Sequence, residues 1–286
     1  MGDRDQFSRT PFYAALVMAV VLVVGVLIGA RVVFERAGNK PVVVSELPAP
    51  QADSAECHGL MDTLPANVAG YQRADIAEPA PESTAAWVKN SEERITLRCG
   101  VEAPAQWVEG AETEVVGGVS WLPVSDPEVH LTTWYSVNRT PVVAVTATDV
   151  NPTEDLAEAV RSLPEGNVAT NALPLAATPT PQAVGCRDFL THLPVAMGDY
   201  RLTKKEGPKA WWQAKGQMPV GVACGVDMPA SYAPGERLTD INGVNWFTEN
   251  GVFYALGFDR VVAVAAAPQG AEEVLVPIGA ALKQAR

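Results

Sequence analysis

The sequence predicts an α+β protein in which an N-terminal transmembrane helix precedes two copies of one domain. Two observations carry this prediction. Residues 12–30 contain no charged side chain, and a set of markers recurs at matched spacing in two parts of the 286-residue chain. Helix-like segments flank strand-like segments in each copy, which predicts an antiparallel sheet with packed helices and one disulfide per copy.

The clearest marker is a Cys-Gly-Val block, which stands at Cys99 and again at Cys224. A Gly-Val-x-Trp block ends at Trp121 and at Trp246, the same distance past each cysteine. Other matched pairs are Trp87 and Trp212, Cys57 and Cys186, and Leu64-Pro65 and Leu193-Pro194. Chance does not repeat several markers at fixed offsets, so we interpret the chain as tandem globular domains.

These markers divide the chain into six parts. Proline is frequent in the two segments that we interpret as a spacer and a linker. We expect a cytoplasmic tail (1–11), a transmembrane anchor (12–34), a spacer (35–55), a first repeat domain (56–163), a Pro-rich linker (164–183) and a second repeat domain (184–286).

The repeated motifs resemble those of an actinobacterial envelope family catalogued as domain of unknown function 3515. The resemblance rests on the Cys-x-x-Leu…Leu-Pro start, the strand Leu97-Arg98-Cys99-Gly100-Val101 and the Gly-Val-x-Trp block. It implies a membrane-anchored or secreted protein and brings no catalytic residue. The second copy departs from the pattern, because Ala223 stands where the first copy has Arg98.

The uncharged run at 12–30 is long enough to cross a bilayer. A helix of that length covers about 28 Å, close to the thickness of the hydrocarbon core. No small-x-small cleavage site follows it, so we expect an uncleaved anchor rather than a cleaved signal peptide. Gly25 and Gly29 form a Gly-x-x-x-Gly pair, which makes a homodimer through this helix a further expectation.

The cysteines decide which side of the membrane the domains occupy. All four fall at matched positions, two per copy, and none has Cys-x-x-Cys spacing. We expect the disulfides Cys57–Cys99 and Cys186–Cys224, each worth roughly 4 kcal/mol, and hence C-terminal domains outside the cytoplasm. The alternative is four reduced core cysteines in a cytosolic domain.

Each copy is expected to run from helix to strands to helix. In the first copy the opening helix covers 57–64 and ends at Pro65. Strands are expected at 94–101, 113–123, 129–137 and 142–148, with a hairpin turn at 138–141. A closing helix follows with Asn151 as its cap. The expected sheet has four or five strands.

The sequence contains no pattern typical of a catalytic, metal or cofactor site. His58, His130 and His192 are expected at the surface, and no phosphate loop or nucleophile elbow is present. We therefore expect no catalytic residue, no metal and no cofactor. A formal net charge of −12 argues against nucleic acid as a partner.

The binding prediction concerns a basic and aromatic segment of the second copy. It contains Arg201, Lys204, Lys205, Lys209 and Trp211, and Lys215 follows. Such a loop can bind anionic lipid headgroups or an anionic envelope polymer. The alternatives are a solvated loop, or a loop that docks on the acidic segment 71–87 of the first copy.

The tryptophans separate into two groups. Trp87, Trp121, Trp212 and Trp246 recur at matched positions and are expected in the cores, whereas Trp107, Trp134 and Trp211 are expected to be partly exposed.

The sequence therefore favours a membrane-anchored, non-catalytic binding or scaffolding protein of the cell envelope, with envelope proteins or polymers as partners. One alternative is an envelope hydrolase or transferase whose carboxylates the sequence does not place. The other is an extracytoplasmic sensor of a small ligand.

Overall fold

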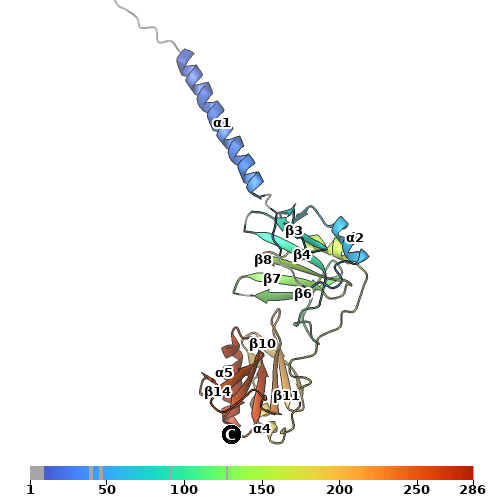
Figure 1. Ribbon diagram of the computed structural model, residues 1–286, viewed down its shortest axis with the longest axis vertical. Coiled ribbons are helices and arrows are strands. Elements are labelled where there is room, and N and C mark those ends of the chain that lie inside the picture. Colours follow the sequence, from blue (N-terminus) through green and yellow to red (C-terminus); the bar gives the residue numbers. More distant parts are fainter. Residues whose placement is uncertain (1–9, 39–40, 45–47, 91, 127, 286) are drawn as a thin grey trace, which may run out of the picture.

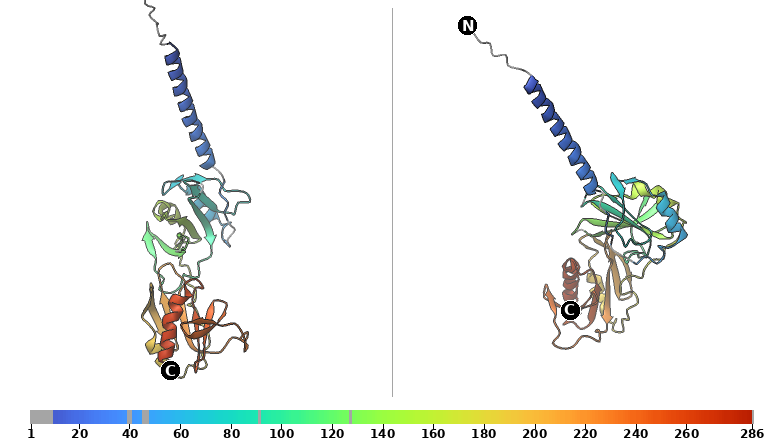
Figure 2. Two further views of the ribbon diagram at one scale, coloured as in Figure 1. Left: turned by 90° about the vertical axis from the view of Figure 1, so that its left-hand side faces the viewer. Right: turned by 45° about the horizontal axis from the view of Figure 1, so that its top comes forward.

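The computed structural model describes residues 10–38, 41–44, 48–90, 92–126 and 128–285. These form one long N-terminal helix and two repeats, each with an eight-stranded antiparallel sheet. In every view the first repeat lies between the helix and the second repeat (Figure 1, Figure 2). Residues 1–9 of the expected tail, and 39–40 and 45–47 of the expected spacer, lie outside the described residues.

The N-terminal helix α1 (Thr10–Gly38) projects away from the repeats as a single rod (Figure 1). Apolar side chains along it, including Leu16, Met18 and Leu27, are more than half exposed. Within the described ranges, no helix is long and apolar enough to cross a membrane.

The first repeat begins with helix α2 and ends with helix α3, as expected. Its elements are α2 (Ala55–Thr63), β1 (Asn67–Val68), β2 (Tyr71–Ala74), β3 (Thr84–Val88), β4 (Arg94–Val101), β5 (Glu114–Val116), β6 (Val119–Asp126), β7 (Leu131–Ser136), β8 (Val142–Thr148) and α3 (Thr153–Arg161). The sheet order is β1-β2-β3-β4-β8-β7-β6-β5.

The second repeat has the same order of elements. They are α4 (Cys186–His192), β9 (Ala196–Met197), β10 (Tyr200–Glu206), β11 (Lys209–Gln213), β12 (Val220–Val226), β13 (Thr239–Ile241), β14 (Val244–Glu249), β15 (Val252–Leu256), β16 (Val261–Ala265) and α5 (Ala271–Gln284). Its sheet order, β13-β14-β15-β16-β12-β11-β10-β9, matches that of the first repeat read from the other edge.

Eight strands per sheet exceed the four or five that the sequence predicts. The expected strand 113–123 is a hairpin, since Gly117 and Gly118 both have positive φ and turn the chain between β5 and β6. The acidic segment 71–87 begins in β2 and ends in β3, and residues 75–83 connect the two strands. The hairpin turn at 138–141 is confirmed, since β7 and β8 pair on either side of it.

Both helices of each repeat cover one face of its sheet, and the core lies between. Trp87 and Trp121 are fully buried in the first core, and Trp212 and Trp246 are fully buried in the second. The repeated Leu-Pro motif has a clear role. The Pro65 carbonyl accepts a 2.9 Å hydrogen bond from the Trp87 indole, and Pro194 and Trp212 repeat this at 2.8 Å. The four predicted core tryptophans are therefore confirmed.

Both predicted disulfides are present. Cys57–Cys99 ties α2 to β4, and Cys186–Cys224 ties α4 to β12. The helix caps differ slightly from expectation: Ser54 caps α2 by accepting from the Cys57 amide, and Asn151 accepts from the Thr153 amide although Pro152 occupies the cap position of α3.

Each Cys-Gly-Val block needs a glycine because another segment of the backbone passes too close to leave room for a side chain. Gly100 and Gly225 have φ near +80° and sit where the register of β4 with β8, and of β12 with β16, shifts. A Cβ would lie 2.3 Å from the Gln51 backbone at Gly100, and 2.4 Å from the Gln182 backbone at Gly225. The segment that precedes each opening helix therefore crosses the sheet at this glycine.

Candidate functional site

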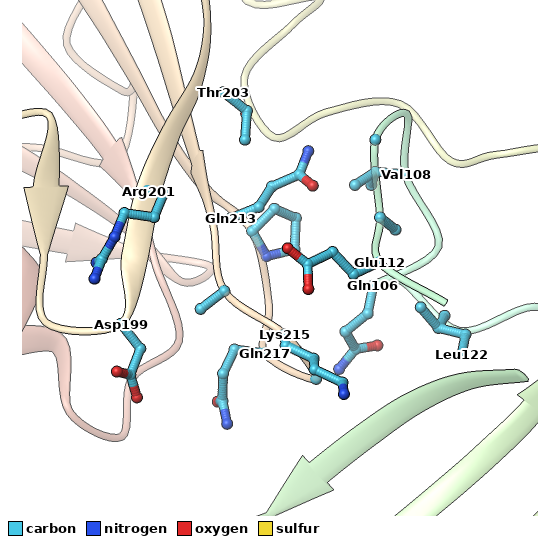
Figure 3. A pocket seen from close by; sticks show the side chains of 15 residues that line it. Gln106, Val108, Glu112, Leu122, Asp199, Arg201, Thr203, Gln213, Lys215 and Gln217 are labelled. Carbon is cyan, nitrogen blue, oxygen red and sulfur yellow. The ribbon is translucent and has the colours of Figure 1, made fainter. Parts of the chain in front are cut away.

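A cleft with both polar and apolar lining lies between the two repeats. Its volume is about 350 Å³, and its walls come from the loop around 106–112 of the first repeat and from β10, β11 and the turn after β11 of the second (Figure 3). Side chains that line it include Gln106, Glu112, Asp199, Arg201, Gln213 and Gln217. Both repeats are needed to form it.

Hydrogen bonds and an ion pair hold the two walls together. The Gln213 Nε2 donates a 2.8 Å hydrogen bond to the Glu109 carbonyl, and the Lys215 Nζ lies 2.6 Å from a Glu114 carboxylate oxygen. The backbone adds a third contact, a 3.0 Å bond from the Ser125 amide to the Gly216 carbonyl. These contacts fix the cleft's width where β11 ends.

Only part of the predicted basic segment faces this cleft. Arg201 is exposed and lines it, next to Asp199 in Figure 3. Lys204 lies at its edge, 3.2 Å from Glu206 and 3.6 Å from Glu109 of the first repeat. The hydrogen bond to Glu206, and then the charges of Glu206 and Glu109, raise the pKa of Lys204.

The other two predicted lysines point elsewhere. The Lys205 Nζ donates to the Leu190 carbonyl at 2.8 Å, and the Lys209 Nζ donates to the Ala176 carbonyl at 2.5 Å. Each therefore ties its strand to a neighbouring segment of the second repeat or the linker. A single binding surface made of all these cations does not form, and the binding role of each remains a prediction.

Trp211 is not partly exposed as the sequence suggested. It retains 2% of its surface, and its indole donates a 2.7 Å hydrogen bond to the Pro174 carbonyl. Trp134 is also buried, at 7%. Trp134 belongs to the core on the helix side of the first sheet, and Trp211 is covered by the linker, so their lack of a repeat partner did not reveal their burial. Trp107 is partly exposed, as expected.

Docking of basic residues on the first repeat does occur, but not on the segment 71–87. Lys204 and Lys215 instead meet Glu109 and Glu114, which lie before and within β5. Both ion pairs are largely solvent-exposed, so they orient the repeats more than they stabilise them.

The cleft is rich in groups that form hydrogen bonds. Gln106, Gln213 and Gln217 provide both amide donors and carbonyl acceptors. Arg201 and Lys215 balance Glu112 and Asp199 in charge. The glutamines were not predicted from the sequence, because they belong to no motif and come together only when the repeats dock.

Among the residues that the structure describes, no group of three or more His, Cys, Asp or Glu side chains is placed to hold a metal ion.

A family model described as "Protein of unknown function (DUF3515)" matches the chain twice, at residues 16–168 and 163–285. No curated protein and no solved structure matches the chain significantly. The two matches coincide with the two sheets and the recurring sequence markers.

Proposed function

We propose that this chain, which belongs to the DUF3515 family in two tandem copies, is a non-catalytic binding or scaffolding protein of the cell envelope. In this proposal α1 holds the two repeats at the outer side of the cytoplasmic membrane. The cleft between the repeats then receives a polar envelope component, such as a segment of glycan.

The location is supported by α1 and by the disulfides. Leu16, Met18, Leu22 and Leu27 on α1 are exposed, and apolar surface in water costs roughly 25 cal/mol per Å². A bilayer would remove that cost. Disulfides persist in oxidising compartments, which favours repeats outside the cytoplasm. A dimer through Gly25 and Gly29 fits this arrangement, since a Cβ at either glycine meets nothing within 4 Å.

The observation that carries the binding proposal is the amide-rich cleft between the repeats. Sugars present many hydroxyl groups that both donate and accept hydrogen bonds, and the glutamine amides and Arg201 can serve both roles. The cleft is partly open to solvent, which suits a segment of a longer polymer. Its mixed charge disfavours a strongly anionic polymer.

One observation supports the enzyme alternative. Glu112 and Asp199 both line the cleft, one from each repeat (Figure 3), and glycan hydrolases act through a pair of carboxyl groups. The test is incubation of the full chain with soluble envelope glycan fragments, followed by chromatography of the products. Cleavage that is lost in both Glu112→Gln and Asp199→Asn would establish a hydrolase. Uncut fragments would reject it.

The binding proposal is tested by photo-crosslinking in cells from a photoreactive residue at position 217, in the cleft. The matched control carries the same residue at position 187, an exposed site on α4. We expect glycan or an envelope protein to be captured from position 217 and not from 187. Equal capture at both positions, or capture of nothing beyond the chain itself, would reject the cleft as a binding site.

A further inference from the structure

The first repeat has a second hollow, on the sheet face opposite its helices. This groove has a volume of about 210 Å³, and we call it the Arg98 groove. The residues that define it are Thr96, Arg98, Glu102, Thr133, Tyr135 and Thr146. It is separate from the cleft between the repeats, so a ligand in the groove does not depend on the function proposed for the cleft.

The strand register explains why these side chains meet. Arg98 on β4 pairs with Ala144 on β8, which pairs with Tyr135 on β7. The small alanine thus leaves a hollow between a guanidinium and a phenol. One step along the same face, Thr96, Thr146 and Thr133 form a second row. The hydroxyls of Thr133 and Thr146 are hydrogen-bonded at 2.9 Å.

The second repeat keeps the tyrosine at these positions but neither the arginine nor the threonines. Its first row is Ala223, Ala263 and Tyr254, and its second row is Gly221, Ala265 and Val252. The fold is the same, so Arg98 and the three threonines of the first repeat are not needed to build it. Their presence calls for another explanation.

The linker seals the second repeat's face. Leu175 packs against Ala223 and Ala263, and the Pro174 carbonyl accepts from Trp211. A Cβ at Gly221 would lie 2.5 Å from that carbonyl, so the linker requires a glycine there. In the first repeat, Pro48 forms one wall of the groove and Ala49 packs beside Ala144, while a cavity remains over the polar rows.

The groove is partly desolvated. Burial lowers the pKa of the Arg98 guanidinium, with Tyr135 acting in the opposite direction. Burial also raises the pKa of the Tyr135 hydroxyl, which keeps it a neutral donor. Hydrogen bonds to a charged group are stronger in such surroundings than in bulk water. Arg98 already takes part in contacts within the chain, and a ligand would join or displace them.

We propose that the Arg98 groove binds a small molecule through a single carboxylate. Arg98 supplies the planar pair of N–H donors that matches a carboxylate, and Tyr135 supplies a third donor. The threonine hydroxyls contact the body of the ligand. Glu102 lies exposed at the rim and repels a second negative charge, which favours a monocarboxylate over a phosphate dianion.

The test is ¹⁹F NMR of the full chain with 4-fluorobenzoate as the probe. Neutral 4-fluorobenzyl alcohol and dianionic 4-fluorophenyl phosphate serve as comparison ligands. We expect saturable binding of the benzoate, weaker binding of the phosphate and none of the alcohol. Tighter binding of the phosphate would overturn the monocarboxylate assignment, and absence of saturable benzoate binding would overturn the site.

Variants locate the binding. Arg98→Ala should lower the affinity for 4-fluorobenzoate roughly tenfold or more. Arg98→Lys should retain part of the affinity, because it keeps the charge but loses the planar pair of donors. Thr146→Val, which is close in shape, should cause a smaller loss. Arg187→Ala, a charge removed from α4, should change nothing. Unchanged affinity in both Arg98 variants, with melting temperatures like the parent's, would contradict the proposal.

Discussion

The two repeats share a sheet order, a disulfide and a buried tryptophan pair. They differ in what lines and covers the outer sheet face, which is the face opposite the helices. The second repeat covers that face with the linker and lines it with Gly221, Ala223 and Ala263. The first repeat places Thr96 and Arg98 at the positions of Gly221 and Ala223, and keeps a cavity. Stability therefore does not explain the polar residues, and the second repeat serves as an internal control.

The comparison also separates two uses of glycine. Gly100 and Gly225 are shared because a crossing segment approaches both, whereas Gly221 is specific to the repeat whose face is sealed. A shared residue in a duplicated domain thus reports on the fold, and an unshared one reports on what each copy does differently.

Removing the disulfides should produce the largest effect, and it should be alike in the two repeats. The bonded cysteines are 42 residues apart in the first repeat and 38 in the second, so the two bonds close loops of similar length. We expect Cys57→Ala with Cys99→Ala, and the equivalent double variant of the second repeat, each to cost about 2–5 kcal/mol of unfolding free energy. Denaturant unfolding measures this. A large loss in one repeat and none in the other would break the similarity of their cores.

Gly225→Ala should come next. The substitution combines a positive φ with a backbone clash against Gln182, so we expect a loss of about 2–4 kcal/mol. Gly251→Ala is the matched control, since Gly251 also has positive φ but its Cβ would meet nothing within 4 Å. If the two variants lose the same unfolding free energy in denaturant, the close approach of the Gln182 backbone is not the reason for glycine at position 225.

A smaller loss of stability should distinguish the outer sheet face of the second repeat from that of the first. Gly221→Ala places a methyl group against the Pro174 carbonyl and should cost about 1–3 kcal/mol. Thr96→Ala, at the equivalent position of the first repeat, should cost less than about 0.5 kcal/mol, because it removes a partly exposed side chain. Thermal unfolding of both variants checks this, and the reverse order would show that the linker does not seal the second face.

The smallest effect should come from the ion pair between the repeats. Lys215→Gln removes a contact to Glu114 in which both side chains are more than a third exposed. We expect this variant to lose less than about 1 kcal/mol of unfolding free energy, and the loss should be smaller still in high salt. A double-mutant cycle with Glu114→Gln isolates the pair. A coupling well above that range would make the interface between the repeats a major source of stability.

The sequence predicts the shared features of the fold well. The equal offset from Cys99 to Trp121 and from Cys224 to Trp246 reveals the duplication. The two cysteines of each copy reveal the disulfides, although the bonded pairs are 42 and 38 residues apart. The opening and closing helices follow from periodicity and caps. The strands β1 to β3 were not predicted, because short strands near a sheet edge lack a continuous apolar pattern.

The sites are predicted far less well. The basic segment around Lys204 is visible in the sequence, but its partners Glu109 and Leu190 come from distant parts of the chain. Trp211 was expected to be exposed because it has no counterpart, whereas the linker covers it. One of the departures between the two strand motifs, Arg98 against Ala223, pointed to the Arg98 groove. The other residues of the groove could be found only from the strand register.

The most direct measurement of the difference between the faces is the labelling rate of a thiol placed at equivalent positions. Ala144→Cys places a thiol on the wall of the Arg98 groove, where Ala144 has 7% of its surface exposed, and Ala263→Cys places one under the linker, where Ala263 has none. With a small thiosulfonate reagent, we expect the thiol at 144 to react about tenfold faster or more, since labelling at 263 requires local opening. Equal rates would contradict the conclusion that one face is open and the other sealed.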